Sequence, residues 1–418
     1  MRNWILTLAV IGGGLLASML PTGQVRAEEP AAAAAEAPKD PTRGQWDSFL
    51  DRWRDGEDAI NGWQGEFEER TKVRFGAAID KSYMWNFNDP ASGKSSLHSL
   101  DPDHNSANLD LAQVSIARPS ENWLPGFGVK LDAGHIARRI KSDWDGDGGV
   151  QRGDDFETND FEVEEAYLTY TLADEAGPLK GLTLKGGKFV TLLGAEVIEP
   201  WLNYNFSRSF LFGYAIPATN TGVLVSYPIA DTLSVTLGGV AGWDNVADNN
   251  NSPSVMGNVT WTACSFFTLG VNGLFGPEQN NKISNKRNVI DVIGTIKATD
   301  DLTFVLNYDN GGEENVLAGP RRANWQGFAG IANYAFTDRF SGALRGEWFE
   351  DSGGARTGTS QGLWETTVDL KYLVTQHLYG RAEYRHDESG SPHVFEAGTA
   401  KATRGQDLVG FEFGYVFN

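Results

Sequence analysis

The sequence predicts an all-β protein, a 16-stranded antiparallel transmembrane β-barrel with a short N-terminal amphipathic helix. Three observations support this fold class. Apolar and polar residues alternate from Val73 onward, and long gaps alternate with short turns between the alternating segments. In addition, no segment beyond the N-terminus holds the roughly 20 consecutive apolar residues that a membrane-spanning helix needs. A chain of this kind can cross a bilayer only as a closed barrel.

The first 27 residues have the form of a secretory signal peptide. Arg2 precedes an apolar run from Trp4 to Leu20, and "VRA" at 25–27 fits a signal-peptidase site. An N-terminal membrane anchor is the alternative, because the run is nearly long enough to span a bilayer. We therefore expect an exported protein, located in the outer membrane of a Gram-negative-type bacterium.

Two segments without strand character follow. Residues 28–44, rich in Ala, Pro and charge, are predicted to form a flexible linker. Apolar residues at three- and four-residue steps then predict a periplasmic amphipathic helix over 45–72, with a break near Gly56. This helix is expected to cap the barrel mouth or to pack on a neighbouring subunit, and a plug inside the barrel is the alternative.

The barrel is predicted over 73–418. In "LSVTLGGVAGWD", Leu233, Val235 and Leu237 share one face, while Ser234 and Thr236 share the other. Period two indicates a strand with one polar and one apolar face. Many such segments are about 9 to 12 residues long, which is the length that crosses a bilayer at a tilt.

The connections predict which end of the barrel faces outward. Eight long gaps and seven short turns separate the sixteen strands. Outer-membrane barrels have short turns on the periplasmic side and long loops outside, and an even strand number leaves both termini in the periplasm. The chain ends "GFEFGYVFN", with alternating aromatics as in terminal strands of such barrels, and aromatic residues gather at both predicted strand ends.

Composition disfavours several classes of function. A formal net charge of −20 disfavours a nucleic-acid partner, and Cys264, the lone cysteine, excludes an intramolecular disulfide. His386, Asp387 and Ser389 are the residue types of a catalytic triad, but they are adjacent in a predicted loop without an oxyanion site. No phosphate-binding glycine motif precedes a helix. The chain is therefore predicted not to be an enzyme.

The stretch "DWDGDGGVQRGD" at 143–154 has the ligand spacing of an EF-hand-like calcium loop, with aspartate where glutamate usually closes it. It lies between two predicted strands, whose adjacent ends would hold the loop. The predicted ligands of a structural Ca²⁺ are Asp143, Asp145, Asp147, Gly149, Gln151 and Asp154. Affinity is expected to be weak, on the order of 10⁻⁴ to 10⁻³ M. A solvated acidic loop is the alternative.

The segment 186–228 carries a family resemblance. Its elements are "GKF" at 187–189, Gly194 with Glu196, Asn205 with "SRS" at 207–209, Pro217, and "TG" at 221–222. It resembles the β-barrel porins of the OmpL-like type (porin-2 family). That family favours His before the "TG", where this chain has Asn220. The resemblance implies an outer-membrane channel.

The longest gap, 194–220, is the third external loop and is dense in aromatic residues. Such a loop would be a poor surface segment, so we expect it to fold into the lumen and narrow it; a position over the rim or in a subunit interface is the alternative. The charged residues predicted to line this constriction are Glu196, Glu199 and Arg208 of the loop, with Arg345, Glu347, Arg381, Glu383 and Arg385 of the wall. These charges could also serve only to keep the lumen wet.

Together these features predict a porin, a passive water-filled channel for small hydrophilic solutes or ions. The alternative is a non-conducting surface barrel whose long external loops bind ions, lipid headgroups or a partner. The expected partners are outer-membrane lipid, small hydrophilic solutes and further copies of the chain, as in a homotrimer.

Overall fold

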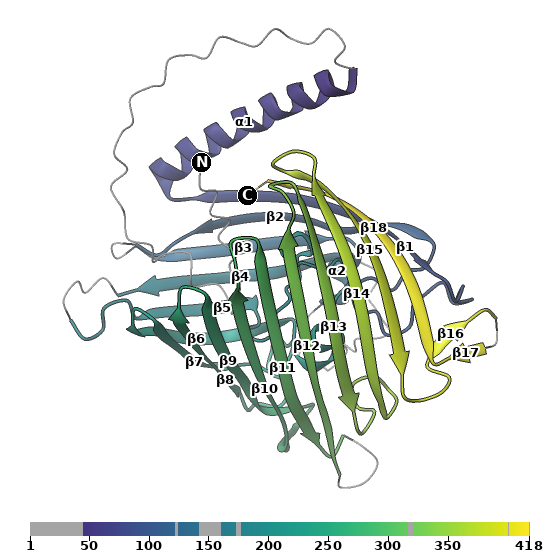
Figure 1. The fold of residues 1–418 in the computed structure, drawn as a ribbon. Helices are drawn as coiled ribbons and strands as arrows, with labels where there is room; N and C mark the ends of the chain where they lie inside the picture. Colours follow the sequence, from purple (N-terminus) through teal and green to yellow (C-terminus); the bar gives the residue numbers. More distant parts are fainter. Residues whose placement is uncertain are drawn as a thin grey trace.

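In a computed structural model of the protein, the described residues are 45–121, 124–141, 160–172, 177–316, 321–399 and 401–417, with side chains described from 51 onward. Sixteen strands of these residues form a closed antiparallel barrel (Figure 1), as predicted. They are β1 (Arg74–Asn86), β2 (Ser106–Arg118), β3 (Gly126–Ala133), β4 (Phe161–Thr171), β5 (Thr183–Val190), β6 (Thr219–Ala230), β7 (Leu233–Val240), β8 (Ser254–Cys264), β9 (Phe267–Gln279), β10 (Lys282–Lys297), β11 (Leu302–Glu314), β12 (Arg322–Ala335), β13 (Phe340–Asp351), β14 (Gln361–Leu373), β15 (Leu378–Ser389) and β18 (Gly405–Phe417). Pairing of β1 with β18 closes the barrel. The short strands β16 (Phe395–Ala397) and β17 (Lys401–Thr403) form a separate hairpin in the last long loop.

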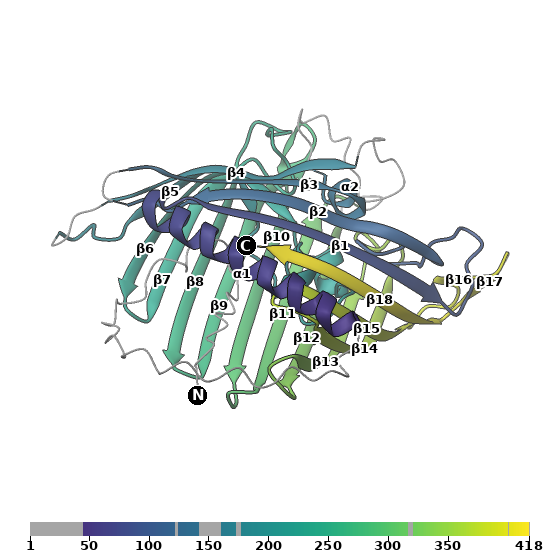
Figure 2. The same ribbon diagram turned by 90° about the horizontal axis from the view of Figure 1, so that it is seen from above.

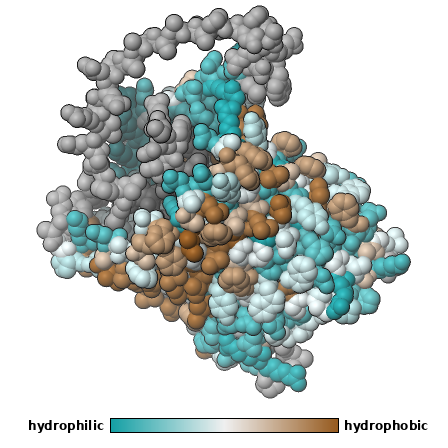
Figure 3. All heavy atoms as spheres, in the orientation of Figure 1, coloured by the Kyte–Doolittle hydropathy of each residue, from teal (hydrophilic) through white to brown (hydrophobic). Residues whose placement is uncertain are grey.

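The alternation of the strands separates a lipid-facing surface from the lumen. On β13, Leu344 and Trp348 are exposed on the outside, whereas Arg345 and Glu347 are buried inside. Outward apolar side chains form a hydrophobic band across the wall, with hydrophilic residues at its lower, external edge (Figure 3). One aromatic row of this band joins four neighbouring strands, β11 to β14, through Tyr308, Phe328, Trp348 and Trp364. This row is the external aromatic belt.

The connections lie as predicted, with brief turns at one end, such as 231–232 and 265–266, and longer loops at the other. One difference concerns β9 and β10, which continue to a two-residue turn at 280–281 where the sequence predicted a longer loop. Backbone pairing does not stop at the edge of the apolar band, because the ladder needs no apolar side chains. Alternating hydrophobicity therefore does not reveal where these strands end.

The helix α1 (Gln45–Thr71) runs without interruption through Gly56, so the predicted break there is wrong. A glycine costs a helix interior only about 1 kcal/mol relative to alanine, and contacts with the barrel on either side of it offset this. The indole of Trp53 packs on Tyr415, with ring centroids 6.0 Å apart, and Thr375 donates a 2.6 Å hydrogen bond to Glu57. Figure 2 shows α1 across the rim of the barrel beside β1 and β18, at the end that carries the short turns.

No helix among the described residues is both long and apolar enough to cross a membrane.

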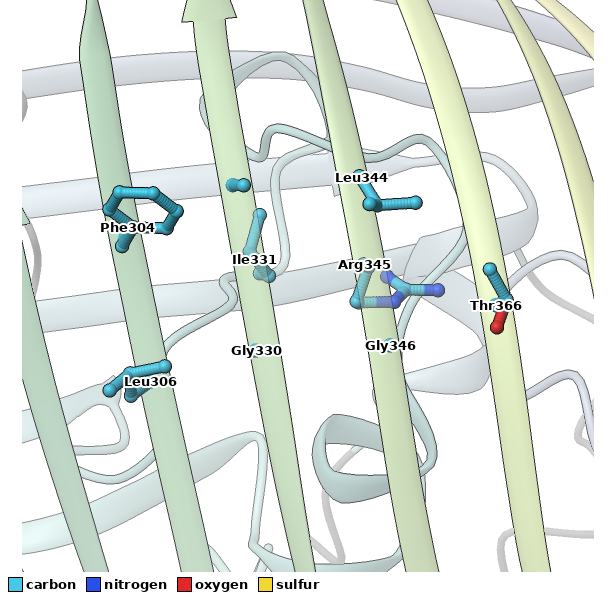
Figure 4. A pocket seen from close by; sticks show the side chains of 9 residues that line it. Phe304, Leu306, Gly330, Ile331, Leu344, Arg345, Gly346 and Thr366 are labelled. Carbon is cyan, nitrogen blue, oxygen red and sulfur yellow. The ribbon is translucent and has the colours of Figure 1, made fainter.

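The outer wall contains a shallow groove of about 350 Å³ (Figure 4). It forms where Gly330 and Gly346 stand side by side on β12 and β13, with Leu306 and Thr366 completing the row. Because neither glycine carries a side chain, the wall is thin at this place. The groove opens on the lipid-facing surface, so it is not part of the lumen.

Candidate functional site

Loop 3, defined in the structure as residues 191–218 between β5 and β6, lies inside the barrel. It contains two short helical turns, η1 (Pro200–Leu202) and η2 (Leu211–Ala215). Phe210, Leu211 and Ile216 are each 1% exposed, and the loop's apolar side chains form one cluster with Trp325 and Phe349 of the wall. The wall also provides space for the loop. A Cβ on Gly327 would lie 2.6 Å from the Leu211 side chain, so glycine there permits this close packing.

Two glutamates of the wall hold the backbone of loop 3. Glu383 on β15 accepts hydrogen bonds from the N–H groups of 206–207, at 2.7 and 3.0 Å. Glu347 on β13 accepts from the N–H groups of 210–211, at 2.7 and 2.6 Å. Hydrogen bonds from backbone N–H groups to a carboxylate are shorter and stronger than neutral ones when the carboxylate is ionised. The two carboxylates thus fix both ends of the segment 206–211 to the wall.

The start of loop 3 is fixed to a different part of the wall. Asp291 on β10 accepts a 3.0 Å hydrogen bond from the N–H of Gly194, and Asn307 on β11 accepts a 3.1 Å bond from the N–H of Ala195. Gly194 has a φ of 92°, a conformation that favours glycine. The chain therefore turns into the lumen at Gly194.

Arg345 joins the wall to loop 3 and is fully buried. Its Nε donates to Glu365 of the neighbouring strand β14 at 2.7 Å. Its Nη1 donates to the Glu196 carboxylate at 2.7 Å and to the Ser207 carbonyl at 2.6 Å. A buried guanidinium is tolerated when its donors are used in this way, and removal of one partner leaves an uncompensated charge.

Two further wall arginines contact carbonyl groups of the same loop. Arg385 donates to the Arg208 carbonyl and to the Asp387 carboxylate, both at 2.6 Å. Arg381 donates to the Asn203 carbonyl at 3.1 Å. Strands β13 to β15 therefore present alternating carboxylates and guanidinium groups to the N–H and C=O groups of the loop backbone.

Arg208 and Glu199, the other predicted charges of the loop, differ in their partners. The Arg208 guanidinium donates to three carbonyls of loop 3 itself, those of Val197, Ile198 and Phe206. Glu199 forms an ion pair with Lys130 of β3, on the wall far from β13 in strand order. Loop 3 is thus attached to both sides of the barrel.

The eight charged residues predicted for the constriction therefore all lie inside the barrel. None of the eight is more than 7% exposed. The charged groups of the wall contact loop 3, and those of the loop contact the wall or other parts of the loop. These contacts position the loop.

Loop 1, residues 87–105, also packs into the external half of the lumen, which the sequence did not predict. The buried imidazole of His98 lies 2.9 Å from Asp101 and 3.1 Å from Asp387 of β15. A Cβ on Gly213 would lie 2.9 Å from the Ser99 hydroxyl, so loop 1 touches η2 of loop 3. Burial alone would lower the pKa of His98, but the Asp101 and Asp387 carboxylates together outweigh burial and the pKa is raised to about 9.

The half of the lumen near the short turns has another lining that sequence reasoning missed. Inward positions there carry short hydroxyl side chains that are partly or fully exposed: Ser115, Thr169, Thr262, Thr268, Thr303 and Ser341. They are uncharged and cannot pair with an ionic solute. This lining could have been found from the sequence, because the alternation of polar and apolar residues puts these hydroxyl side chains on the polar face of each strand.

The predicted calcium loop, 143–154, lies outside the described residues and stays a prediction. Within the described part of the chain, no group of three or more His, Cys, Asp or Glu side chains is arranged to hold a metal ion.

Comparison with known proteins gives one family and a set of similar folds. The model of the family described as "Putative beta-barrel porin-2, OmpL-like" matches residues 72–417. A search of curated protein sequences gives no match.

The similar solved structures are outer-membrane proteins. The trimer form of OmpT of Vibrio cholerae matches with a TM-score of 0.53 at 14% identity, covering 82% of this chain and 99% of that one. An anion-selective porin from Comamonas acidovorans gives 0.53 at 9% identity, with coverage of 82% and 99%. The outer membrane channel DcaP of Acinetobacter baumannii gives 0.53 at 10% identity, with coverage of 82% and 97%. At such low identity these likenesses show the fold.

Proposed function

Since this chain belongs to the putative β-barrel porin-2 family, OmpL-like, and is an outer-membrane porin, we propose that it is a passive channel for small hydrophilic solutes or ions whose bore is set by loop 3. The observation that carries this proposal is the attachment of loop 3 inside the lumen, by Glu347, Glu383 and Arg345 on one side and by Lys130 on the other. Because loop 3 is held at several points, it narrows the passage permanently and does not open and close as a lid would.

The chemistry of the lumen supports solutes that are hydrophilic but not tightly bound. Many inward charges contact loop 3, as Glu347, Glu383 and Arg345 do, and inward positions near the short turns carry partly or fully exposed hydroxyl groups. Hydroxyl groups both donate and accept hydrogen bonds, so they replace water around a polar solute at little cost. Passage without tight binding is what conduction requires.

Conductance in planar bilayers tests this proposal. Deletion of Trp201 to Phe212 removes the middle of loop 3, but it leaves Glu347 and Glu383 without partners. The deletion should therefore be made together with Glu347→Gln and Glu383→Gln, with the double substitution alone as the matched control. We expect stepwise currents from the wild type and a larger unit conductance from the deletion. An unchanged unit conductance in a folded deletion would contradict the role of loop 3. Absence of stepwise currents from folded wild type would favour the non-conducting surface barrel.

We also propose that the protein assembles as a homotrimer. Lys81 is an exposed, outward residue in the middle of β1, between the apolar residues Leu109 and Phe413 of the neighbouring strands. A lysine at the middle of a lipid-facing wall costs about 2 to 4 kcal/mol, and a neighbouring subunit over β1 would avoid that cost. Native mass spectrometry in detergent gives the stoichiometry. Lys81→Glu should dissociate the trimer, whereas Val271→Glu, at an outward position of β9 on the opposite side of the ring of strands, should not.

The calcium site is a separate proposal. The ends of β3 and β4 pair with each other, so the loop that joins them is held by adjacent strands. We propose that Ca²⁺ binds the carboxylates of Asp143, Asp145, Asp147 and Asp154 and relieves their mutual repulsion. Calcium titration with protease protection as the readout, beside Asp143→Ala and Asp147→Ala, tests it. Protection of wild type and both variants alike, or of none, would contradict the site.

A further inference from the structure

We propose that the outer face of β10 to β12, above the external aromatic belt, binds the phosphorylated headgroup of a glycolipid in the outer leaflet. This goes beyond the channel function, since it concerns the outside of the wall. Four basic residues gather at this place, on two neighbouring hairpins: Lys282, Lys286, Arg321 and Arg322.

The strand register places two of these cations, Lys286 and Arg322, on the lipid-facing side. Arg287 points inward, where it pairs with Glu313 at 2.7 Å, so alternation turns Lys286 outward. Arg322 faces outward for the same reason, because its neighbour Ala323 is buried. Lys286 and Arg322 both flank Glu314 of β11, one on each side.

An amide layer lies between these cations and the aromatic belt. Above Tyr308 and Phe328, the outward positions carry amide side chains: Asn288, Asn310, Asn324 and Gln326. Amides both donate and accept hydrogen bonds, as the hydroxyl groups of sugars do. From the membrane outward, the wall therefore presents an aromatic row, an amide layer and then cations.

The height of the cations distinguishes a glycolipid from a phospholipid. From Phe328 to Arg322 the strand advances six residues, about 20 Å along its length and roughly 15 Å along the barrel axis at the usual tilt. The polar headgroup region of a phospholipid bilayer adds only about 5 to 8 Å per side. The cations thus lie above a phospholipid headgroup, at the height of a lipid with phosphate groups on extended sugars.

Acidic residues occupy outward positions on the strands that follow β12. Outward positions on β13, β15 and β18 include the acidic residues Glu350, Glu388 and Asp407, and Glu350 pairs in register with Gln326 of the amide layer. Within the described residues, no ion pair is formed by the four basic side chains; Arg322 donates only to the Asn324 amide. They are available to an external anion.

Native mass spectrometry of the purified, detergent-solubilised protein tests the proposal with three probes. These are lipopolysaccharide with a phosphorylated core, the same lipid after enzymatic dephosphorylation, and dioleoylphosphatidylglycerol. We expect the phosphorylated glycolipid to bind most tightly. Lys286→Gln with Arg322→Gln should weaken its binding about 25-fold, because each basic side chain near an anionic lipid surface contributes about fivefold.

The matched control is Lys297→Gln with Arg339→Gln, which removes two exposed charges at the other end of the same part of the wall. It should leave binding unchanged. Glu314→Gln should tighten binding, since it removes the negative charge between Lys286 and Arg322 while an amide oxygen can still accept the Lys286 N–H, 3.1 Å from the carboxylate. Equal binding of phosphatidylglycerol or of the dephosphorylated lipid, equal loss in both double variants, or no gain from Glu314→Gln would each overturn the proposal.

Discussion

At the scale of single residues, the charges of the lumen act on backbone groups of loop 3. Glu347 and Glu383 each accept two consecutive N–H groups, and Arg345, Arg381 and Arg385 donate to carbonyls of the same loop. A loop that leaves a strand has N–H and C=O groups that no ladder satisfies, and burying them unpaired would be costly. The wall side chains supply those partners, which explains why loop 3 can lie inside the barrel.

The first prediction concerns one of these partners. Glu347→Gln leaves a single acceptor oxygen for the two N–H groups of 210–211, each of which now donates to its own carboxylate oxygen. We expect the free energy of unfolding to fall by about 1.5 to 3 kcal/mol, the range for hydrogen bonds to charged groups. Urea unfolding in detergent micelles, followed by tryptophan fluorescence, measures this. Glu350→Gln on the outer face of the same strand is the control, and an equal loss in both variants would contradict the attachment.

The second prediction concerns pH. The pKa of His98 is raised to about 9, above its usual value near 6.5, so folding favours the protonated imidazole between Asp101 and Asp387. That stabilisation is fully present below pH 6.5 and is lost as pH rises through 9. Loop 1 should therefore loosen between pH 7 and pH 10, seen as faster hydrogen exchange of residues 88–105 after correction for the intrinsic rate. His98→Gln should remove this dependence, and an unchanged pH profile in that variant would rule out the imidazole as its cause.

At the scale of elements, α1 is attached to the rim by contacts with several strands and a turn. The Gln64 amide donates to the Phe75 carbonyl at 2.9 Å, and Asn61 lies 3.0 Å from the His377 imidazole. These contacts run along the helix at the end of the barrel that carries the short turns. They place the helix across the wall ends of β1, β18 and β15, beside the opening of the lumen.

The third prediction follows from that position. A chain that begins at residue 73 lacks α1 but keeps every barrel strand and loop 3, so its unit conductance in planar bilayers should equal that of the full chain. Its thermal stability should fall, because the contacts of Glu57, Asn61 and Gln64 are lost. The control is Glu66→Ala in the full chain, at an exposed position of the same helix. A larger unit conductance of the shortened chain would show that the helix obstructs the lumen.

The strands and loops also show which features of the structure could be predicted from the sequence. Alternation predicted the strands, because one face of each strand meets lipid, and aromatic density placed the third loop in the lumen. The position of loop 1 was not predictable, since its apolar residues Leu97 and Leu100 are isolated among polar ones. The partners of Arg345 were not predictable either. Glu196 is 149 positions away, and only the closed barrel brings the two together.

At the scale of the whole molecule, the closed ring of strands determines which groups stay unpaired and at which rim each segment lies. Every barrel strand pairs on both edges, so no edge is left for pairing with other chains. Sixteen is an even number, so both ends of the barrel chain, Arg74 and Phe417, lie at the same rim. Contacts of α1 with the turn at 374–377 place this helix at that rim as well.

The last prediction is the orientation of this ring in the outer membrane. Outer-membrane barrels have short turns in the periplasm and long loops outside, so 352–360 between β13 and β14 should face the medium, and 298–301 between β10 and β11 the periplasm. An epitope inserted at 352–360 should be labelled by antibody on intact cells, and one inserted at 298–301 only after the outer membrane is permeabilised. Both variants must first show the heat-modifiable gel mobility of a folded barrel, because a misfolded chain would be labelled only in broken cells. Labelling of intact cells at 298–301 but not at 352–360 would invert the barrel. It would then move loop 3 and the cations of β10 to β12 to the periplasmic side, which excludes an outer-leaflet lipid as their ligand.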